Sequence, residues 1–354
     1  METLTEIPVR KIPRSRLSEV DFSNLEFGTI TSDHMLICDY ANGDWQMPQI
    51  VPFANMSINP SSLALHYGQT VFEGMKAFRM KDGRINIFRI EKHYQRFAKS
   101  LERMCMAVVP KDVFVDGLVQ LISLDHLWVP EDGNAALYIR PFVYANEARF
   151  GIAVSQEYRF IIFTGPVPSL YSEPIKVKVE TNYIRAGKGG TGAAKCGGNY
   201  GGSLLPTKNA REQGYDQVLW TDSKENKFIE ESGMMNVMFV IDDTIITPPV
   251  SDSILDGVTR DSILTIAKQL GFPTIEKQIS LEKLTAAFTE GSITAAFGVG
   301  TAAVIAPISV INIEGIDYHL PAYRDGNILS LLKSRLNGIR VGDFNDSEGW
   351  NFVI

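Results

Sequence analysis

The sequence GGTGAAKCGGNYGG, residues 189–202, places a single lysine, Lys195, among glycines and alanines. A phosphate-binding loop of the GxxxxGK type requires Ser or Thr directly after its lysine, whereas Lys195 is followed by Cys196, so the nucleotide-binding interpretation fails on spacing. A lone lysine among small residues also suits a Schiff base with a flat aromatic aldehyde, because glycine and alanine leave room on both sides of the amine. An ordinary solvated lysine in a flexible surface loop is the alternative that this stretch alone leaves open.

The composition predicts a globular protein of two domains. The 354 residues are 45% apolar and 21% charged, and this length exceeds what one hydrophobic core usually organises. The net charge of −7 argues against a nucleic-acid partner, and no apolar run reaches the roughly 20 residues of a membrane-spanning helix. The three cysteines include no CxxC pair and the five histidines no HxxxH pair, so neither a disulfide framework nor a metal site is expected. Because the N-terminus also lacks the apolar segment of a secretory signal, a cytoplasmic location is predicted.

Strand and helix patterns alternate along the chain, with hairpin turns expected at residues 42–43, 81–83 and 242–243. Helical periodicity is found over 90–104 and 259–272. The stretch GPVPSLYSEP is the clearest break in composition, and we interpret it as a linker. This mixed order favours an α+β or α/β fold over a doubly wound nucleotide-binding fold. The predicted division is a domain of residues 1–164, a linker at 165–174 and a domain of residues 175–354.

A candidate anion site lies in LDGVTRDSIL, residues 255–264. Gly257 permits close approach, and the backbone amides of Val258 and Thr259 open the helix that follows. Helix N-termini bind anions such as phosphate because their amides have no partner within the helix and the helix dipole is positive there. A turn of this kind before a helix is common, so the motif is weak when taken alone.

Two adjacent carboxylates, Glu230 and Glu231, enter the predicted strand of FIEESGMMNVMFV. Since successive strand side chains face opposite sides, at most one of them is expected to point inward and the other to be solvated. An inward carboxylate beside a pyridine ring would hold the ring nitrogen protonated and make the ring an electron sink. A pair of exposed glutamates at the start of a strand is the alternative.

Several motifs, in matching order, resemble those of the class IV aminotransferases. ESGMMN, IIT and LDGVTR, within residues 231–260, look like the signature of that class. LHYGQTVFEGMKAF, LYIRP, GGTGAAKCGGNYG and FGVGTA together resemble the branched-chain amino acid aminotransferases, and the similarity extends from about Phe27 to the C-terminal GW. The resemblance implies a two-domain enzyme of fold type IV, with a small N-terminal α/β domain and a larger C-terminal domain of mixed, β-barrel-like structure with helices. It also implies the cofactor pyridoxal 5′-phosphate at the domain interface.

By this resemblance Lys195 is the catalytic lysine, which forms the Schiff base and moves a proton between substrate and cofactor. The spacing to Asn236 selects Glu231 as the partner of the pyridine nitrogen. The other implied cofactor-binding residues are Arg96, Tyr200, Val258, Thr259 and Thr301. The implied substrate-binding residues are the aromatic pocket walls Phe27, Tyr67 and Tyr138, Arg140, which forks onto the carboxylate of glutamate, and Ala302, in the turn that binds the substrate carboxylate.

The resemblance further implies reversible transamination between leucine, isoleucine or valine and 2-oxoglutarate by a homodimer. D-amino acid aminotransferases and aminodeoxychorismate lyases share the fold and are the alternatives, although LYIRP and FEGMKAF weigh against both. Met234 stands where many relatives carry threonine, so any contact made by that hydroxyl is absent here. Tyr171, in the linker, could close over the substrate, but the sequence leaves its position open.

Overall fold

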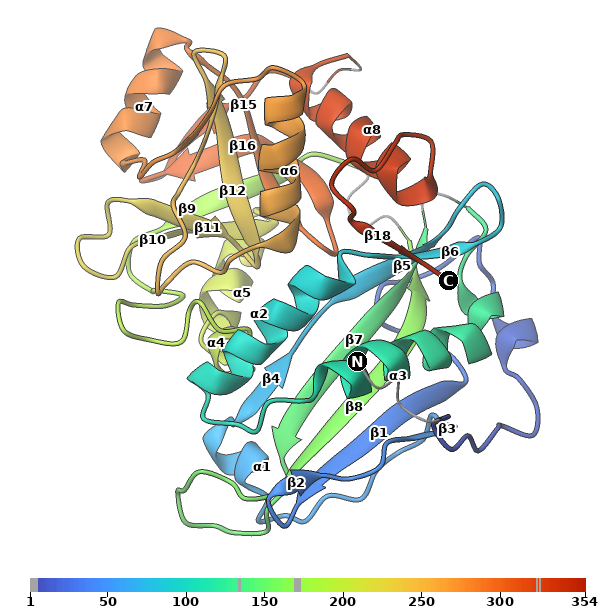
Figure 1. Ribbon diagram of the computed structural model, residues 1–354. Helices are drawn as coiled ribbons and strands as arrows, with labels where there is room; N and C mark the ends of the chain where they lie inside the picture. The colour runs from blue at the N-terminus through green and yellow to red at the C-terminus, as the bar shows by residue number, and fades with distance from the viewer. Residues whose placement is uncertain (1–5, 133–134, 169–172, 323, 325) are drawn as a thin grey trace. The chain divides into compact units, whose positions relative to one another are not determined.

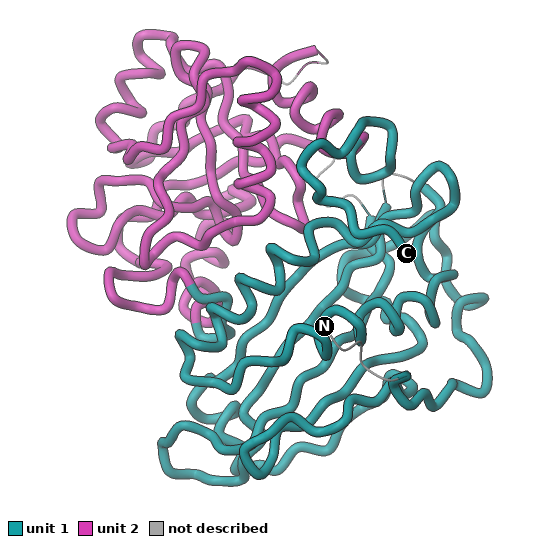
Figure 2. The backbone as a smooth tube through the Cα atoms, in the orientation of Figure 1, with its two compact units in different colours: residues 1–170, 194–198, 339–354 teal, residues 171–193, 199–338 magenta. Residues whose placement is uncertain are grey.

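The computed structural model describes residues 6–132, 135–168, 173–322, 324 and 326–354. The chain forms two compact units, which Figure 2 distinguishes by colour. Unit 1 comprises residues 1–170, 194–198 and 339–354, and unit 2 comprises residues 171–193 and 199–338. Much of the predicted linker, including Tyr171, lies outside the described residues.

This division differs from the one expected from the sequence, which assigned everything after residue 174 to a larger C-terminal domain. Unit 1 is instead the larger of the two, because it also contains residues 194–198 and 339–354. Long-range pairing is the physical reason. Strand β18 (Asn351–Val353) pairs with β6 (Ile85–Phe88), and Cys196 forms an isolated bridge with Val71.

Unit 1 is built on a nine-stranded sheet. The strand order is β18, β6, β5, β7, β8, β1, β2, with β3 added beside β1 and β4 beside β7, and each of these pairings is antiparallel. The remaining strands of this sheet are β1 (His34–Ala41), β2 (Asp44–Trp45), β3 (Gln49–Pro52), β4 (Thr70–Phe72), β5 (Met75–Arg79), β7 (Ala136–Ala145) and β8 (Tyr158–Val167).

The hairpins of this sheet form where the sequence predicts them. Asn42 and Gly43, between β1 and β2, have φ angles of 56° and 85°, the left-handed values that a two-residue turn requires and that asparagine and glycine tolerate. A second turn at residues 81–83 joins β5 to β6, and Gly83 has a φ of 86°. Both predictions are confirmed.

Helices α2 (Ile90–Arg103) and α3 (Lys111–Leu124) run across the sheet of unit 1 (Figure 1). Their apolar faces close the core, in which the rings of Phe97, Phe114 and Phe160 contact one another with centroids 5.5–6.0 Å apart. Burial of these aromatic side chains provides a large part of the hydrophobic stabilisation of the unit. The shorter helical segments of unit 1 are η1 (Leu17–Glu19), α1 (Leu63–Tyr67) and η2 (His126–Trp128).

Unit 2 contains a closed β-barrel. Its strands follow the order β11, β10, β9, β16, β15, β12, and β12 pairs again with β11, which closes the ring. Strands β13 and β14 extend from β12, and β17 pairs with β16. The mixed, barrel-like fold expected for the C-terminal part is therefore confirmed. The strands are β9 (Ile175–Glu180), β10 (Gln217–Thr221), β11 (Ile229–Ser232), β12 (Met235–Ile241), β13 (Thr244–Thr247), β14 (Thr274–Glu276), β15 (Ile293–Gly300), β16 (Val304–Ile313) and β17 (Ile316–His319).

Helices of the C-terminal half pack against strands of this barrel. Helix α6 (Val258–Gln269) packs against β15 and buries Ile263 and Ile266, as its periodicity predicts (Figure 1). Among the described residues, no helix is long and apolar enough to cross a membrane. The other helices are α4 (Gly198–Gly201), α5 (Leu204–Glu212), α7 (Leu281–Glu290) and α8 (Ile328–Val341).

Candidate active site

Lys195 is held through its main chain in unit 1. Its backbone N–H donates to the hydroxyl of Ser100 at 3.0 Å, and its carbonyl accepts the N–H of Phe72 at 3.0 Å. Gly197 lies against β4 so closely that a Cβ would come within 2.4 Å of the hydroxyl oxygen of Thr70. A glycine is therefore required at this position, and the loop around Lys195 is a docked segment, which excludes the alternative of a flexible surface loop.

The side chain of Lys195 lies over the ring of Phe72, with Nζ 4.8 Å from the ring centroid. The guanidinium carbon of Arg140 is 4.9 Å from the same centroid and 5.3 Å from that of Tyr138. The ring of Phe27 meets Tyr138 edge-on at 5.2 Å. Four residues predicted for the site are thus brought together around Phe72. We call these five residues, Phe27, Phe72, Tyr138, Arg140 and Lys195, the Phe72 cluster.

Arg140 carries an unused donor within this cluster. One of its Nη atoms donates to the hydroxyl of Tyr138 at 3.1 Å, while its buried Nε has no hydrogen-bond partner among the described residues. A buried donor without a partner is costly, and such groups commonly mark the place of a ligand. Gly74 allows this arrangement, because a Cβ there would lie 2.0 Å from the hydroxyl oxygen of Tyr138.

Arg96 lies on the buried face of α2 and is 8% exposed, so it is not an ordinary solvated charge on the helix surface. Its Nε and Nη2 donate to the two oxygens of Glu73 at 2.7 and 2.8 Å, and Nδ1 of His93 lies 2.9 Å from one of those oxygens. Burial disfavours the imidazolium and lowers the pKa of His93, although Glu73 acts in the opposite direction. The two hydrogen bonds to Glu73 fix the orientation of the Arg96 guanidinium.

Tyr67, the remaining pocket wall predicted from the sequence, lies at the end of α1 and is 41% exposed. Its hydroxyl donates to the carbonyl of Phe150 at 2.6 Å. This bond ties α1 to the segment after β7, so Tyr67 has a structural contact of its own in addition to its predicted role.

In unit 2, Glu231 is almost fully buried on β11. One carboxylate oxygen accepts the N–H of Leu255 at 2.9 Å and the side-chain amide of Asn236 at 3.2 Å. The other oxygen lies 2.8 Å from Nε of Arg185. These donors and the positive charge favour the ionised carboxylate, which is the form able to accept a hydrogen bond from a protonated ring nitrogen.

The expectation that Glu230 is solvated is wrong. Glu230 is 8% exposed and accepts a hydrogen bond from the hydroxyl of Ser253. Burial raises the pKa of Glu230. Strand alternation does turn the two glutamates to opposite sides of β11, but the segment that contains Ser253 covers the second side as well. Both faces of the strand are therefore buried.

The first turn of α6 begins beside Glu231. Gly257, at the N-cap, could not carry a side chain, because a Cβ would lie 1.9 Å from the amide oxygen of Asn236. No side chain among the described residues caps this helix, so the amides of Val258 and Thr259 open it as predicted. Both residues are buried, at 2% and 4% exposure.

The predicted carboxylate-binding turn, Thr301 and Ala302, joins β15 to β16 in unit 2. Both residues are half-buried. Val304, the first residue of β16, has a φ of 63°, which is rare for a β-branched residue, and such backbone strain concentrates at functional sites. Tyr200 lies in the short helix α4 and is half-buried.

Comparison with known proteins identifies the family. Residues 70–311 match the model of the family described as amino-transferase class IV. The chain belongs to the class IV aminotransferases. Branched-chain-amino-acid transaminase 1 of Bacillus subtilis is 41% identical to this aminotransferase over 339 residues, which cover 94% of this chain and 95% of the relative. The branched-chain-amino-acid aminotransferase of Mycobacterium tuberculosis is 39% identical over 333 residues, covering 92% and 90%.

A solved structure agrees with these relatives. The branched-chain amino acid aminotransferase of Escherichia coli matches this aminotransferase with a TM-score of 0.74 and 27% identity, and the match covers 90% of this chain and 98% of the other. The relatives place the chain among the branched-chain amino acid aminotransferases, as the motifs predicted. The cofactor of class IV aminotransferases is pyridoxal 5′-phosphate.

The residues of this aminotransferase fit that cofactor. Unit 1 contributes the amine of Lys195 and the oriented guanidinium of Arg96, which suit an aldehyde and a phosphate. Unit 2 contributes a buried carboxylate, Glu231, which suits a pyridine nitrogen, and an uncapped helix start at Val258, which suits a phosphate. Each unit, taken by itself, therefore holds groups that suit part of this cofactor.

Sequence reasoning missed four residues of this arrangement. Phe72 and Glu73 stand inside the quoted motif LHYGQTVFEGMKAF, so their position in a site motif was a usable signal. Ser100 follows Arg96 by one helical turn, and Arg185 precedes the glycine-rich loop. Neither of these two carries a signal that separates it from an ordinary helix serine or loop arginine.

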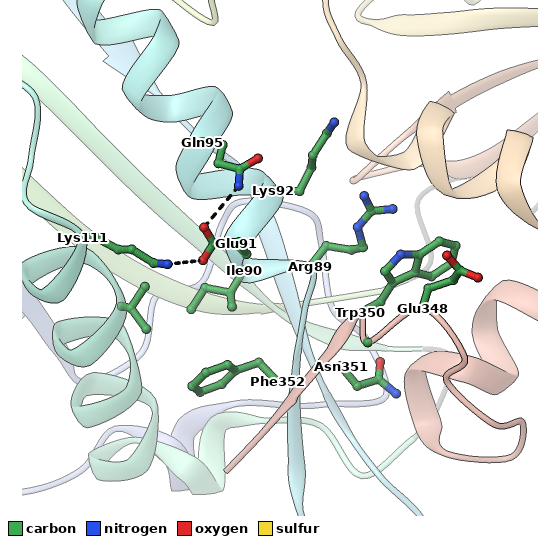
Figure 3. A pocket seen from close by; sticks show the side chains of 12 residues that line it. Arg89, Ile90, Glu91, Lys92, Gln95, Lys111, Glu348, Trp350, Asn351 and Phe352 are labelled. Atoms are coloured by element: carbon green, nitrogen blue, oxygen red, sulfur yellow. Dashed lines mark hydrogen bonds and ion pairs between the residues drawn. The ribbon is translucent and has the colours of Figure 1, made fainter. Parts of the chain in front are cut away.

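A pocket of about 480 Å³ in unit 1 contains none of the predicted site residues (Figure 3). It lies where α2, α3 and β18 meet. Glu91 receives a hydrogen bond from Gln95 and pairs with Lys111 at 2.6 Å, as the dashed lines show. Arg89 lies over the ring of Trp350 at 4.7 Å. Because these polar groups contact one another, the pocket does not require a charged ligand.

Proposed function

We propose that this aminotransferase catalyses the reversible transfer of an amino group between a branched-chain L-amino acid and 2-oxoglutarate. Leucine, isoleucine and valine are the proposed amino-acid substrates. The observation that carries the proposal is the Phe72 cluster, in which an amine, three aromatic rings and an arginine with a buried unpartnered donor lie together. The name of the Bacillus subtilis relative, a branched-chain-amino-acid transaminase, supports the same substrate class.

When bound, pyridoxal 5′-phosphate supplies an aldehyde that joins covalently to amines and a pyridine ring that withdraws electrons from the substrate Cα. Lys195 is the proposed catalytic residue. Its ε-amine would hold the cofactor through the aldehyde and would move a proton at the substrate Cα. The two hydrogen bonds of its backbone, to Ser100 and to Phe72, fix the position of the Lys195 main chain, from which the side chain extends.

Glu231 is the proposed partner of the ring nitrogen. Arg185 and the two donors on Glu231 favour its ionised form, so that the carboxylate holds a proton on that nitrogen. The proposed phosphate-binding groups are Arg96 in unit 1 and, in unit 2, the amides of Val258 and Thr259 together with Thr301. These are cationic or fixed backbone donors, which suit a dianion. Tyr200 donates its hydroxyl to the phenolic oxygen of the cofactor.

The substrate contacts follow from the shape and charge of the cluster. The rings of Phe27, Phe72 and Tyr138 contact the branched hydrocarbon side chain, with Tyr67 as a further wall. Arg140 donates its buried Nε–H to the side-chain carboxylate of glutamate or 2-oxoglutarate. The turn at Ala302 binds the carboxylate next to Cα through backbone amides. The Phe72 cluster thus suits both an apolar and an acidic substrate side chain.

A homodimer in the cytoplasm is part of the same proposal. Phe150 and Ile152, in the segment between β7 and β8, are 83% and 80% exposed, and Leu65 on α1 is 60% exposed. Tyr67 ties these two segments together through its bond to Phe150. Large exposed apolar groups of this kind are typical of surfaces that another protein chain covers. All three cysteines are free, which fits a reducing compartment.

A substrate panel tests the proposal. Purified protein loaded with pyridoxal 5′-phosphate is assayed with 2-oxoglutarate and, separately, L-leucine, L-isoleucine, L-valine and D-alanine, with glutamate formation as the readout. Aminodeoxychorismate is assayed for lyase activity in parallel. Turnover of the three branched L-amino acids, with little from the other two compounds, is expected. Turnover of D-alanine or aminodeoxychorismate in their place would assign the chain to the corresponding alternative.

A further inference from the structure

The buried face of α2 carries three polar side chains where an amphipathic helix normally carries apolar ones. His93, Arg96 and Ser100 are 2%, 8% and 1% exposed. Their spacing of three and four residues places them in one row along the helix. Glu73, which is fully buried in the link between β4 and β5, lies against this row. We call these four residues the α2 polar cluster.

Hydrogen bonds within the cluster account for its burial. Glu73 accepts two hydrogen bonds from the guanidinium of Arg96, at 2.7 and 2.8 Å. Its carboxylate also lies 2.9 Å from Nδ1 of His93 and accepts the N–H of Gly74 at 3.1 Å. A buried charge pair is tolerated only when its donors and acceptors are satisfied in this way. The cluster therefore has a defined geometry, in which the guanidinium of Arg96 cannot turn without breaking two bonds to Glu73.

Ser100 connects this cluster to Lys195. Its hydroxyl donates to the carbonyl of Arg96 at 2.8 Å and accepts the N–H of Lys195 at 3.0 Å. On its other side, Lys195 accepts the N–H of Phe72, which precedes Glu73 in the chain. The contacts form a closed circuit from Lys195 through Ser100, Arg96 and Glu73 to Phe72 and back to Lys195. A serine that bonds only to the carbonyl one turn earlier is common in helices, whereas the second bond to Lys195 is specific to this site.

We propose that Ser100 is a positioning residue, which fixes the main chain of Lys195 and links it to Arg96, so that the reactive amine and the proposed phosphate-binding guanidinium are held by one buried cluster. This inference rests on the proposed function, since it takes Lys195 as the residue that binds the cofactor. A hydroxyl suits the position because it can donate and accept at the same time. Alanine would leave the N–H of Lys195 without this acceptor.

Ser100→Ala and a matched control, Ser32→Ala, test the inference in the full-length protein. Ser32 is also fully buried in unit 1, and its hydroxyl lies 2.5 Å from that of Thr164, outside the proposed site. We expect both variants to lose thermal stability. Only Ser100→Ala is expected to raise the Kd for pyridoxal 5′-phosphate, by roughly tenfold, as for one lost buried hydrogen bond, and to shift the pH titration of the bound chromophore.

Ser100→Cys keeps the size of the side chain while its thiol is a weak hydrogen-bond partner, so we expect an intermediate Kd. This variant decides the matter if Ser100→Ala does not fold. If the wild-type protein binds the cofactor and both Ser100 variants match Ser32→Ala in Kd and in chromophore titration, the inference is overturned while the proposed function stands. If the wild-type protein does not bind pyridoxal 5′-phosphate, the proposed function is overturned and the inference with it.

Discussion

Replacing Glu73 by glutamine tests the buried ion pair that orients Arg96. Glu73 is fully buried, and each of its oxygens receives a guanidinium N–H, at 2.7 and 2.8 Å. Glutamine keeps the shape of the side chain but leaves the guanidinium buried without its counter-charge, and removing one partner of such a pair costs about 3–5 kcal/mol. We therefore expect Glu73→Gln to lower the free energy of unfolding of the apo-protein by about 3 kcal/mol. Urea denaturation, monitored by tryptophan fluorescence, measures this free energy of unfolding.

An exposed pair of the same geometry provides the control. Arg159 donates to both oxygens of Asp39 at 2.6 and 2.8 Å, but the two side chains are 25% and 42% exposed. Because solvent screens this pair, Asp39→Asn is expected to cost less than about 1 kcal/mol. The double variant Glu73→Gln/Arg96→Met should lose less than the sum of its two single variants, because it leaves no stranded charge. Equal losses from Glu73→Gln and Asp39→Asn, or strict additivity, would refute the reasoning.

The same variant has a defined pH dependence. Burial by itself raises the pKa of Glu73, but Arg96 and His93 outweigh burial and hold the pKa below its ordinary value of 4.5. Since the folded pKa lies below that of the unfolded chain, the ionised carboxylate stabilises the fold above that ordinary pKa, and this contribution is lost as the pH falls. The stability difference between wild type and Glu73→Gln should therefore shrink below pH 4.5.

Three further predictions concern separate features. Burial, and secondarily Arg340, lowers the pKa of Lys76 from 10.5 to about 7. Between these two values the unfolded chain binds more protons than the folded one, so the free energy of unfolding should rise by about 2 kcal/mol from pH 7 to about pH 9. Urea titrations should find that Lys76→Met abolishes this rise. Gly74→Ala places a methyl group 2.0 Å from the hydroxyl oxygen of Tyr138, so kcat/KM for L-leucine should fall at least about tenfold while circular dichroism stays unchanged. Phe150→Asp puts a charge into the exposed apolar surface, so analytical ultracentrifugation should find monomer in place of the proposed dimer.

Local patterns in the sequence were sufficient for several turns and helices and for a set of candidate site residues. The turn at Asn42 and Gly43 was predictable because only a few residues tolerate two successive left-handed conformations. The start of α6 at Val258 was predictable because a glycine precedes a clear helical periodicity. The motifs around Lys195 and Glu231 supplied candidates because an amine and a carboxylate carry their chemistry in the side chain, and only the family resemblance separated Glu231 from Glu230.

Contacts between distant parts of the chain were not predictable. Glu73 and Arg96 are 23 residues apart, and Lys195 and Ser100 are 95 residues apart, so no periodicity connects them. Glu230 was misjudged for the same reason, because the cover over its side of β11 comes from the segment around Ser253. The membership of residues 194–198 and 339–354 in unit 1 likewise depends on pairing with strands far away in sequence.

The covalent attachment of the cofactor is the most direct test of the account. The protein loaded with pyridoxal 5′-phosphate is reduced with borohydride, digested and mapped by mass spectrometry. We predict that the pyridoxyl label is found on Lys195. Lys76 is the informative comparison within the chain, because burial lowers its pKa to about 7. A label on Lys76, or a protein whose peptide containing Lys195 stays unmodified, would contradict the account.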